Sequence, residues 1–200
     1  MLSNFFHGSS YPQEKRDMLH YKYKTVPYKH QEEALNNCWE KTEYALFMEM
    51  GCGKSKVLLD NMAVLYAKGT INAALIVAPK GVYDNWIEGE IPIHLPDYIK
   101  RRIYRWSPAE TQKNQKKRDE ILRFSHDLDI VVMNVEALST KKGTDFAAKF
   151  LLNKRALFTI DESTSIKSPS AARTKNALRL AKYAVHRRIL TGSPVTRSPL

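Results

Sequence analysis

Short apolar runs alternate along the chain with longer segments that have the spacing of amphipathic helices. The apolar runs, which we expect to be strands, cover residues 44–48, 73–78, 102–105, 129–133, 156–160 and 188–191. The segments that predict helices lie at 28–39, 53–68, 82–91, 108–124, 144–152 and 168–184. Runs that are apolar throughout indicate strands buried on both faces of a parallel sheet. The pattern therefore predicts an α/β fold, a mostly parallel twisted sheet with helices on both faces.

Residues that break or cap a helix mark the ends of several predicted helices. Gly69 follows the second helix and Pro92 follows the third, so we expect these helices to end there. Ser168 and Pro169 have the order of a cap and a first helical position, and predict the start of the last helix. Residues 1–24 have no clear period, and we interpret them as an N-terminal accessory segment ahead of a single domain at 25–197.

The sequence Gly-Cys-Gly-Lys-Ser at 51–55 lies between a predicted strand and a predicted helix. Glycines let backbone N–H groups approach phosphate oxygens, and the helix start adds unpaired donors and a positive dipole end. Lys54 is predicted to act catalytically by bridging the β- and γ-phosphates of ATP, and the Ser55 hydroxyl to hold Mg²⁺. The strict motif has glycine at the position of Met48, so an ordinary glycine-bearing turn is the alternative.

Asp161 and Glu162 directly follow the apolar run at 156–160. Because ligands of parallel sheets bind at the carboxyl ends of the strands, we expect these carboxylates beside the phosphate loop. Asp161 is predicted to hold Mg²⁺, directly or through water. Glu162 is predicted to be the second catalytic residue, which orients and deprotonates the attacking water. An isolated Asp-Glu pair would otherwise be an ordinary solvated loop.

Two further segments add weaker indications. Gln31 offers a donor and an acceptor that match the N6 and N7 edge of adenine, and Tyr28 could stack on the base. A glutamine on a helix surface is the alternative. Thr191, Gly192 and Ser193 follow the last predicted strand, where they would couple the presence of the γ-phosphate to the carboxylate loop. The predicted ATP site is Tyr28, Gln31, Met50, Gly51, Cys52, Gly53, Lys54, Ser55 and Lys56.

The net charge of +11 favours a polyanionic partner: DNA, RNA or an anionic membrane. One basic run lies at 100–105 and continues at 113–118. A generally basic surface is the alternative. Beyond Glu162 the chain has no acidic residue but contains Lys167, Arg173, Lys175, Arg179, Lys182, Arg187, Arg188 and Arg197.

The cysteine pattern and the lack of long apolar runs bear on the compartment. Cys38 and Cys52 have no metal-ligand spacing, and we interpret both as free thiols in a reducing compartment. No apolar run approaches the roughly 18 residues that a membrane helix needs, and residues 1–11 lack the pattern of a signal peptide. We expect a cytoplasmic protein with no membrane partner, in the host-cell cytoplasm if it is viral.

The order of these motifs resembles that of the superfamily-2 helicases and translocases. Gln31 is followed by Gly-Cys-Gly-Lys-Ser at 51–55, Ala-Pro-Lys at 78–80, Met-Asn-Val-Glu-Ala-Leu at 133–138, Asp-Glu-Ser at 161–163 and Leu-Thr-Gly-Ser-Pro at 190–194. Within that superfamily the chain is most similar to SWI/SNF-type DNA translocases and to related phage helicases of the DEAD/DEAH type. The resemblance covers residues 25–197 and implies the N-terminal RecA-like P-loop NTPase lobe of such a motor.

The resemblance also implies contacts with a nucleic-acid backbone, and double-stranded DNA is the implied partner. Those contacts would be made by Lys80, Gly81, Asn134, Glu136 and Lys167. In the family the acidic motif commonly has a histidine at the position of Thr164. A threonine at this position would leave metal binding and hydrolysis intact, but it would change how the state of the bound nucleotide is transmitted to residues 191–193.

Family members carry two RecA-like lobes, and the second supplies an arginine finger that contributes about 10³–10⁵ in rate. No second set of motifs occurs in the 200 residues. We therefore expect the second lobe in the same polypeptide or in another chain, with weak or no turnover by this lobe alone. The sequence predicts ATP hydrolysis coupled to movement on nucleic acid once two lobes are joined. The alternatives are a nucleotide-switched nucleic-acid-binding module without turnover and another P-loop enzyme, such as a small kinase, against which the Asp-Glu pair argues.

Overall fold

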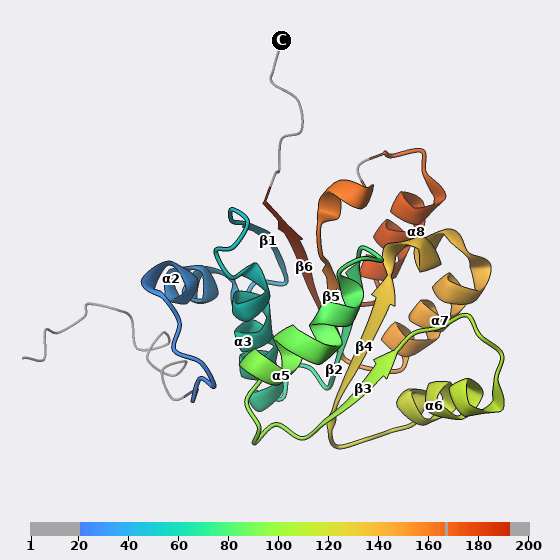
Figure 1. Cartoon of the computed structure of the whole chain (residues 1–200), viewed down its shortest axis with the longest axis horizontal. Helices are drawn as coiled ribbons and strands as arrows, with labels where there is room; N and C mark the ends of the chain where they lie inside the picture. Colours follow the sequence, from blue (N-terminus) through green and yellow to red (C-terminus); the bar gives the residue numbers. More distant parts are fainter. Residues whose placement is uncertain (1–20, 167, 193–200) are drawn as a thin grey trace, which may run out of the picture.

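Six parallel strands form a single sheet in the computed structural model, which describes residues 21–166 and 168–192 (Figure 1). They are β1 (Glu43–Phe47), β2 (Ala73–Ala78), β3 (Arg101–Arg105), β4 (Leu128–Asn134), β5 (Ala156–Ile160) and β6 (His186–Thr191). Their order across the sheet is β1-β6-β5-β2-β4-β3, and every neighbouring pair is parallel. The predicted fold class is confirmed, and the carboxyl ends of all six strands share one edge.

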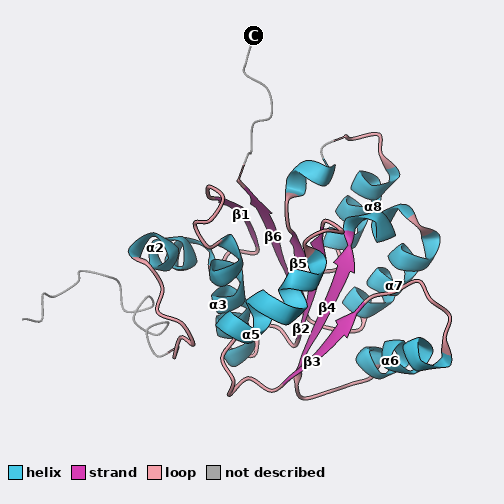
Figure 2. Ribbon diagram, viewed as in Figure 1, coloured by secondary structure: helices cyan, strands magenta, loops and turns pink. Residues whose placement is uncertain are grey.

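Helices cover both faces of the sheet (Figure 2). The helices of the described residues are α2 (Lys29–Cys38), α3 (Lys54–Ala67), α4 (Tyr83–Asn85), α5 (Ile91–His94), α6 (Gln112–Leu122), α7 (Lys141–Leu152) and α8 (Ala172–Ala181). A π-helical turn lies at Trp86–Glu90, and 3₁₀ turns lie at Val135–Ser139 and Ser163–Ile166. α3 and α5 lie on one side of the sheet, and α7 and α8 on the other (Figure 1).

Strand β2 shows how the sequence fills both layers of the core. All six of its residues are buried, and alternate residues enter different apolar clusters. Ala74 and Ile76 belong to the cluster that includes the buried residues of α3. Leu75 and Val77 belong to the cluster that includes those of α7 and α8. A strand must be apolar at every position where helices cover both faces of a sheet, which is why this run could be located in the sequence.

The predicted helix at 82–91 does not end before Pro92. It continues to His94, and its middle turn, Trp86–Glu90, is π-helical. The Ile91 N–H donates to the Trp86 carbonyl five residues back, so this turn is wider than an α-helical turn. A proline inside an α-helix lacks an N–H and its ring clashes with the carbonyl four residues back. The wider turn relieves that conflict at Pro92.

Three other helices start away from their predicted positions, and side-chain caps set two of these starts. α6 and α7 begin directly after Thr111 and Thr140, whose hydroxyls accept hydrogen bonds from N–H groups three residues on. α8 begins at Ala172 and not at Ser168, because the Ser168 hydroxyl bonds that of Ser170 instead of capping a helix. The predicted helix start at Ser168 is therefore wrong.

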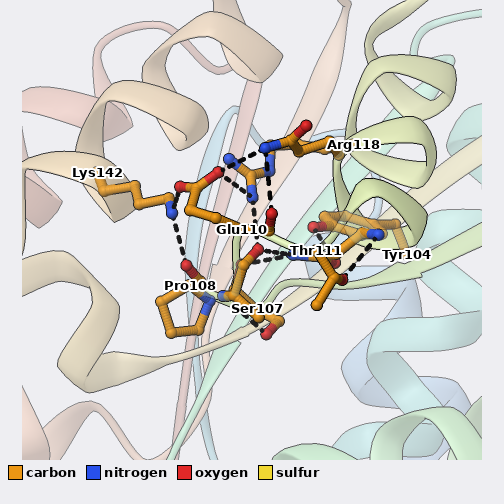
Figure 3. Close-up of polar contacts among 10 residues, drawn as sticks. Tyr104, Ser107, Pro108, Glu110, Thr111, Arg118 and Lys142 are labelled. Carbon is orange, nitrogen blue, oxygen red and sulfur yellow. Dashed lines mark hydrogen bonds and ion pairs between the residues drawn. The ribbon is translucent and has the colours of Figure 1, made fainter.

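The loop at 106–111, which joins β3 to α6, is held in place by side chains from two helices (Figure 3). Lys142 of α7 donates to the Pro108 carbonyl at 2.5 Å and forms an ion pair with Glu110. Arg118 of α6 lies 3.9 Å from the same Glu110 carboxylate. Because the loop follows the carboxyl end of β3, these contacts fix one more segment at the edge where ligands bind.

Candidate functional site

The loop between β1 and α3 has the backbone of a phosphate-binding turn. Gly51 and Gly53 have φ values of +80° and +81°, which favour glycine over residues with a side chain. Gly53 is the N-terminal cap of α3, and its carbonyl accepts the Val57 N–H. The N–H groups at 54–56 precede that bond and have no acceptor within the helix, so they can bind an anion.

The Lys54 ammonium is held against this loop by two backbone carbonyls. It donates to the Met48 carbonyl at 3.0 Å and to the Glu49 carbonyl at 3.2 Å. Met48 replaces the first glycine of the strict motif without strain, because its φ is not positive and its side chain packs against the core. Phosphate oxygens are stronger partners for an ammonium than neutral carbonyls, so Lys54 can exchange one set for the other.

Gln31 lies against the same loop. Its Nε2 donates to the Cys52 carbonyl at 3.1 Å, and its Oε1 accepts from the Tyr28 N–H at 3.0 Å. The His30 ring also contacts the Cys52 carbonyl, at 3.0 Å. Because Gln31 is only 7% exposed, the alternative of a helix-surface glutamine is wrong. Each half of its amide can make one further hydrogen bond, and the Tyr28 ring nearby is exposed.

Asp161 and Glu162 follow β5 as predicted, and their backbone is unusual. Glu162 has a φ of +48° and is the only non-glycine residue with positive φ in the part of the chain that the structure describes. Such a conformation costs on the order of 1–3 kcal/mol and is found mainly at functional sites. The Glu162 N–H donates to Asp161 Oδ1 at 2.9 Å, which helps to hold this conformation.

The Asp161 carboxylate is buried, and both of its oxygens accept hydrogen bonds. Oδ1 accepts from Glu162, and Oδ2 accepts from the Trp86 indole N–H at 2.9 Å. Burial raises the pKa of Asp161, whereas these two hydrogen bonds and the charge of Lys54 lower it. The carboxylate is thus held in one orientation and lies within the field of the phosphate-loop lysine.

Strand β6 lies between β1 and β5, so the carboxylate pair is not on the strand next to the phosphate loop. The buried Thr191 accepts the Met48 N–H at 3.4 Å through its carbonyl. A Cβ atom at Gly192 would lie 3.3 Å from Met50 Cγ and 3.6 Å from Lys54 Nζ. Thr191 and Gly192 are therefore in contact with the phosphate loop, and Ser193 lies outside the described residues.

Glu90 and Asn85 belong to this site, although the sequence analysis did not single them out. Asn85 Nδ2 donates to Glu90 Oε1 at 3.3 Å, and the Ser55 hydroxyl lies near the same carboxylate. Burial raises the pKa of Glu90, the bonds from Asn85 and Ser55 lower it, and the Asp161 charge raises it. A glycine at 89 inside the predicted helix and a proline at 92 directly after it are the signal that could have revealed an irregular turn here.

The Lys56 side chain is not available to a nucleotide, so its predicted part in ATP binding is left to its backbone N–H. Lys56 is only 3% exposed, and its ammonium pairs with Asp60 and lies 4.9 Å from the centre of the Tyr23 ring. Tyr21 donates to the same carboxylate at 3.1 Å. Helical geometry places Lys56 on the side of α3 that packs against residues 21–25, so only its backbone N–H can serve the phosphate loop.

Ser55 and Asp161 supply the oxygen donors that Mg²⁺ prefers. Across residues 21–166 and 168–192, no group of three or more His, Cys, Asp or Glu side chains could hold a metal ion. Mg²⁺ commonly takes only one or two protein ligands and fills its octahedral shell with water and phosphate oxygens. The sparse donor set therefore fits Mg²⁺ bound together with a nucleotide and does not fit an independent metal centre.

The predicted nucleic-acid residues follow strands in the other half of the sheet. Lys80 and Gly81 are exposed after β2, and Glu136 is exposed after β4. Asn134 has a structural role, since its Oδ1 accepts the N–H three residues on at 2.9 Å and caps the 3₁₀ turn. Lys167 lies outside the described residues. The exposed members of the set share the edge of the sheet with the loop at 106–111.

Ion pairs and burial remove part of the basic surface that the sequence predicts. Arg102 pairs with Asp129 and Arg105 pairs with Asp84, while Arg188 is only 1% exposed. Exposed basic residues on helices include Lys113, Lys116 and Lys117 of α6, and Lys175, Arg179 and Lys182 at α8. Among the described helices, none has the length and apolar character needed to cross a membrane.

Known sequences similar to this chain are proteins named for chromatin remodelling. The family described as the SNF2-related domain matches residues 30–200. Protein CHROMATIN REMODELING 24 of Arabidopsis thaliana is 29% identical over 179 residues, which are 86% of this chain and 16% of that protein. SWI/SNF-related matrix-associated actin-dependent regulator of chromatin subfamily A containing DEAD/H box 1A, of Danio rerio, is 30% identical over 152 residues. That match covers 76% of this chain and 15% of the relative, so the chain spans about one sixth of the curated relatives' length.

Two solved structures share the RecA-like fold of this chain. The SWI2/SNF2 ATPase core of Sulfolobus solfataricus in complex with double-stranded DNA has a TM-score of 0.65 and 20% identity, covering 87% of this chain and 33% of that chain. The UvsW helicase of bacteriophage T4 has a TM-score of 0.59 and 14% identity, covering 84% of this chain and 53% of that chain. At these identities the likeness establishes the fold alone.

Proposed function

The chain belongs to the SNF2-related domain family, and we propose that it is the ATP-binding lobe of an ATP-dependent DNA translocase. The observation that carries the proposal is how the carboxyl edge of the sheet is divided. The adjacent strands β1, β6 and β5 end in the phosphate loop, Gly192 and Asp161. The adjacent strands β2, β4 and β3 end in Lys80, Glu136 and the fixed loop at 106–111. Nucleotide and DNA would thus be held at one edge of the same sheet, as the coupling of ATP hydrolysis to movement on DNA requires.

Binding of ATP would fall to residues at the start of α2 and α3. The backbone N–H groups of the phosphate loop and the Lys54 ammonium would hold the phosphates. The remaining donor and acceptor of the Gln31 amide would meet the adenine edge, with the exposed Tyr28 ring against the base. Because Gln31 is also hydrogen-bonded to Cys52, the residue that meets the base would be linked directly to the loop that binds the phosphates.

Hydrolysis would depend on residues from three elements. Ser55 and Asp161 would hold Mg²⁺, which neutralises charge that develops on the transferred phosphoryl group. Glu162 would orient the attacking water and accept its proton. Gly192, in contact with Met50 at the phosphate loop, would transmit the change after hydrolysis to β6.

A second lobe is the expected protein partner. An arginine finger supplied from outside this lobe typically contributes about 10³–10⁵ in rate. The chain is also far shorter than the relatives that it matches. We therefore expect this chain to bind ATP with Mg²⁺ but to release phosphate slowly when alone.

The test measures ATP-analogue binding and phosphate release in parallel, without DNA and with single-stranded or duplex DNA. Lys54→Ala should abolish nucleotide binding, and Glu162→Gln should retain binding but remove release. Lys68→Ala, at the opposite end of the same helix, is the matched control and should behave like the unmodified chain. Undiminished nucleotide affinity in Lys54→Ala would contradict the phosphate-loop assignment.

The same assay distinguishes the proposal from a nucleotide-switched binding module. Phosphate release that duplex DNA stimulates, and that Glu162→Gln removes, supports a translocase lobe. Tight nucleotide binding with no release above the Glu162→Gln level, even after the second lobe is supplied, favours the module without turnover.

A further inference from the structure

One π-helical turn contacts both side chains that are assigned to Mg²⁺. The turn Trp86–Glu90 joins α4 to α5. Its first residue, Trp86, donates its indole N–H to Asp161 Oδ2 at 2.9 Å. Its last residue, Glu90, has its carboxylate near the Ser55 hydroxyl, which lowers the pKa of that carboxylate. Ser55 lies on α3 and Asp161 lies after β5, so the turn physically links two groups that come from separate elements.

Neighbouring groups hold Glu90 in this position. Asn85 Nδ2 lies 3.3 Å from its Oε1, and His94 Nε2 lies 3.7 Å from its Oε2. A Cβ atom at Gly89 would lie 2.7 Å from the Asn85 Oδ1, so glycine leaves the space that Asn85 occupies. His94 is fixed in turn by Thr25, whose hydroxyl lies 2.8 Å from its Nδ1. Glu90 is therefore an ordered, half-buried carboxylate and not a mobile surface group.

The chemistry of the two contacts suits ligands of a cation. A hydroxyl that binds a cation uses the lone pairs of its oxygen, and its proton needs an acceptor elsewhere, which Glu90 supplies. A carboxylate that binds a cation must keep one orientation, and the Trp86 N–H fixes that orientation with a donor that does not dissociate. Groups that orient metal ligands in this way typically change metal affinity by about 10- to 100-fold when they are removed.

We propose that Trp86 and Glu90 are positioning residues of the magnesium site: Trp86 orients the Asp161 carboxylate and Glu90 orients the Ser55 hydroxyl. This inference rests on the proposed function, since it requires that Ser55 and Asp161 hold Mg²⁺ together with ATP. Trp86 and Glu90 act through those two ligands and not on the nucleotide. Their loss should weaken the binding of Mg²⁺ while binding of the metal-free nucleotide stays unchanged.

The experiment titrates Mg²⁺ into the chain with a fluorescent, non-hydrolysable ATP analogue, and measures binding of the analogue in EDTA separately. Glu90→Ala should raise the Mg²⁺ midpoint about tenfold, and Glu90→Gln, which keeps an acceptor for Ser55, should raise it less. Glu88→Gln is the matched control, because Glu88 is an exposed carboxylate on the same turn. It should leave the midpoint unchanged.

The tryptophan is tested by Trp86→Phe, which should also raise the Mg²⁺ midpoint about tenfold. Trp106→Phe is its control: Trp106 is also buried, and its indole nitrogen has no hydrogen-bond partner within the described part of the chain. Addition of Mg²⁺ should change the tryptophan fluorescence of the unmodified chain and of Trp106→Phe, but not that of Trp86→Phe. This optical signal does not depend on turnover.

Gly89→Ala is a third variant, which replaces neither a magnesium ligand nor a positioning residue. Its Cβ would displace Asn85 from Glu90, so the variant should reproduce part of the Glu90→Ala defect. If Trp86→Phe fails to fold, the Glu90 and Gly89 variants still test whether the turn positions the magnesium ligands.

Two results would overturn the inference. The first is an unchanged Mg²⁺ midpoint in both Glu90→Ala and Trp86→Phe while Lys54→Ala still fails to bind nucleotide. That result would reject the positioning role of Trp86 and Glu90 but not the proposed function. Weaker binding of the analogue in EDTA, in parallel with the loss of Mg²⁺ affinity, would show that the turn supports the whole site and not the metal ligands. Normal nucleotide binding by Lys54→Ala would instead reject the proposed function itself.

Discussion

The side-chain amide nitrogen of Gln31 lies 3.1 Å from the carbonyl oxygen of Cys52, so helix α2 is hydrogen-bonded to the middle of the phosphate loop. A Cβ atom at Gly53 would overlap Gln31 Nε2, which means that the helix approaches the loop as closely as a glycine permits. The residue expected to meet adenine and the turn expected to hold phosphate therefore cannot move independently.

This contact predicts that Gln31→Glu weakens binding of an ATP analogue about tenfold. The carboxylate can still accept the Tyr28 N–H, but it cannot donate to the Cys52 carbonyl and leaves two acceptors facing each other, a loss of about 1–3 kcal/mol. Fluorescence titration measures the affinity. Glu33→Gln, an exposed change on the same helix, is the control, and equal affinities for the two variants would disprove the linkage.

Arg188 should contribute strongly to stability, because it is a buried cation that bonds to backbone and amide oxygens. It donates to the Cys38 carbonyl at 2.7 Å, near the negative end of the α2 dipole, and to Asn61 Oδ1 at 2.9 Å. Burial lowers the pKa of Arg188. Arg188→Met would leave these acceptors unpaired and should lower the free energy of unfolding by about 3 kcal/mol.

Urea denaturation measures that change, with Arg187→Met as the control. Arg187 is the adjacent residue, is partly exposed and pairs with Glu43 at the surface, so its loss should cost less than about 1 kcal/mol. Similar losses for the two arginine variants would contradict the role assigned to Arg188.

The two thiols should differ in reactivity and in their effect on stability. Burial raises the pKa of Cys38 from its ordinary value of 9.0 to about 11, whereas Cys52 is partly exposed in the phosphate loop. At pH 8, N-ethylmaleimide should label Cys52 alone, and the ATP analogue with Mg²⁺ should slow that labelling; mass spectrometry identifies the site. Labelling of Cys38 in the folded chain at the same rate would contradict its burial.

The raised pKa of Cys38 also sets the direction of a pH effect. The folded chain favours the neutral thiol, so the stabilisation is fully present below about pH 9 and is lost as the pH rises toward 11. The free energy of unfolding should fall over that range, and Cys38→Ala should make the fall shallower. An equally steep fall in the variant would assign the effect to other groups.

Lys80 tests whether DNA binds at one edge of the sheet or over a generally basic surface. Lys80→Ala should weaken duplex binding and reduce the slope of log affinity against log salt by about one, because one phosphate contact is lost. Lys100→Ala is the matched control, since Lys100 is exposed just before β3, at the opposite edge of the sheet. Equal losses in the two variants would favour the generally basic surface.

The sequence by itself determined the strands and the phosphate-binding turn. The runs that became β2 and β5 have the predicted bounds, because a strand covered by helices on both faces is apolar at nearly every position. Gly51 and Gly53 could be assigned because a left-handed backbone between a strand and a helix requires glycine. These features depend on neighbouring residues, which a sequence displays directly.

The tertiary structure alone decided the order of the strands and the partners of the charged side chains. The placement of β6 between β1 and β5 brings Gly192 against the phosphate loop, and no local pattern specifies it. Lys56 and Arg188 count as surface charge in a sequence, yet both are buried by partners from packed elements. The Trp86–Asp161 hydrogen bond joins residues far apart in the chain. Such contacts form only when distant segments pack, so composition and periodicity do not contain them.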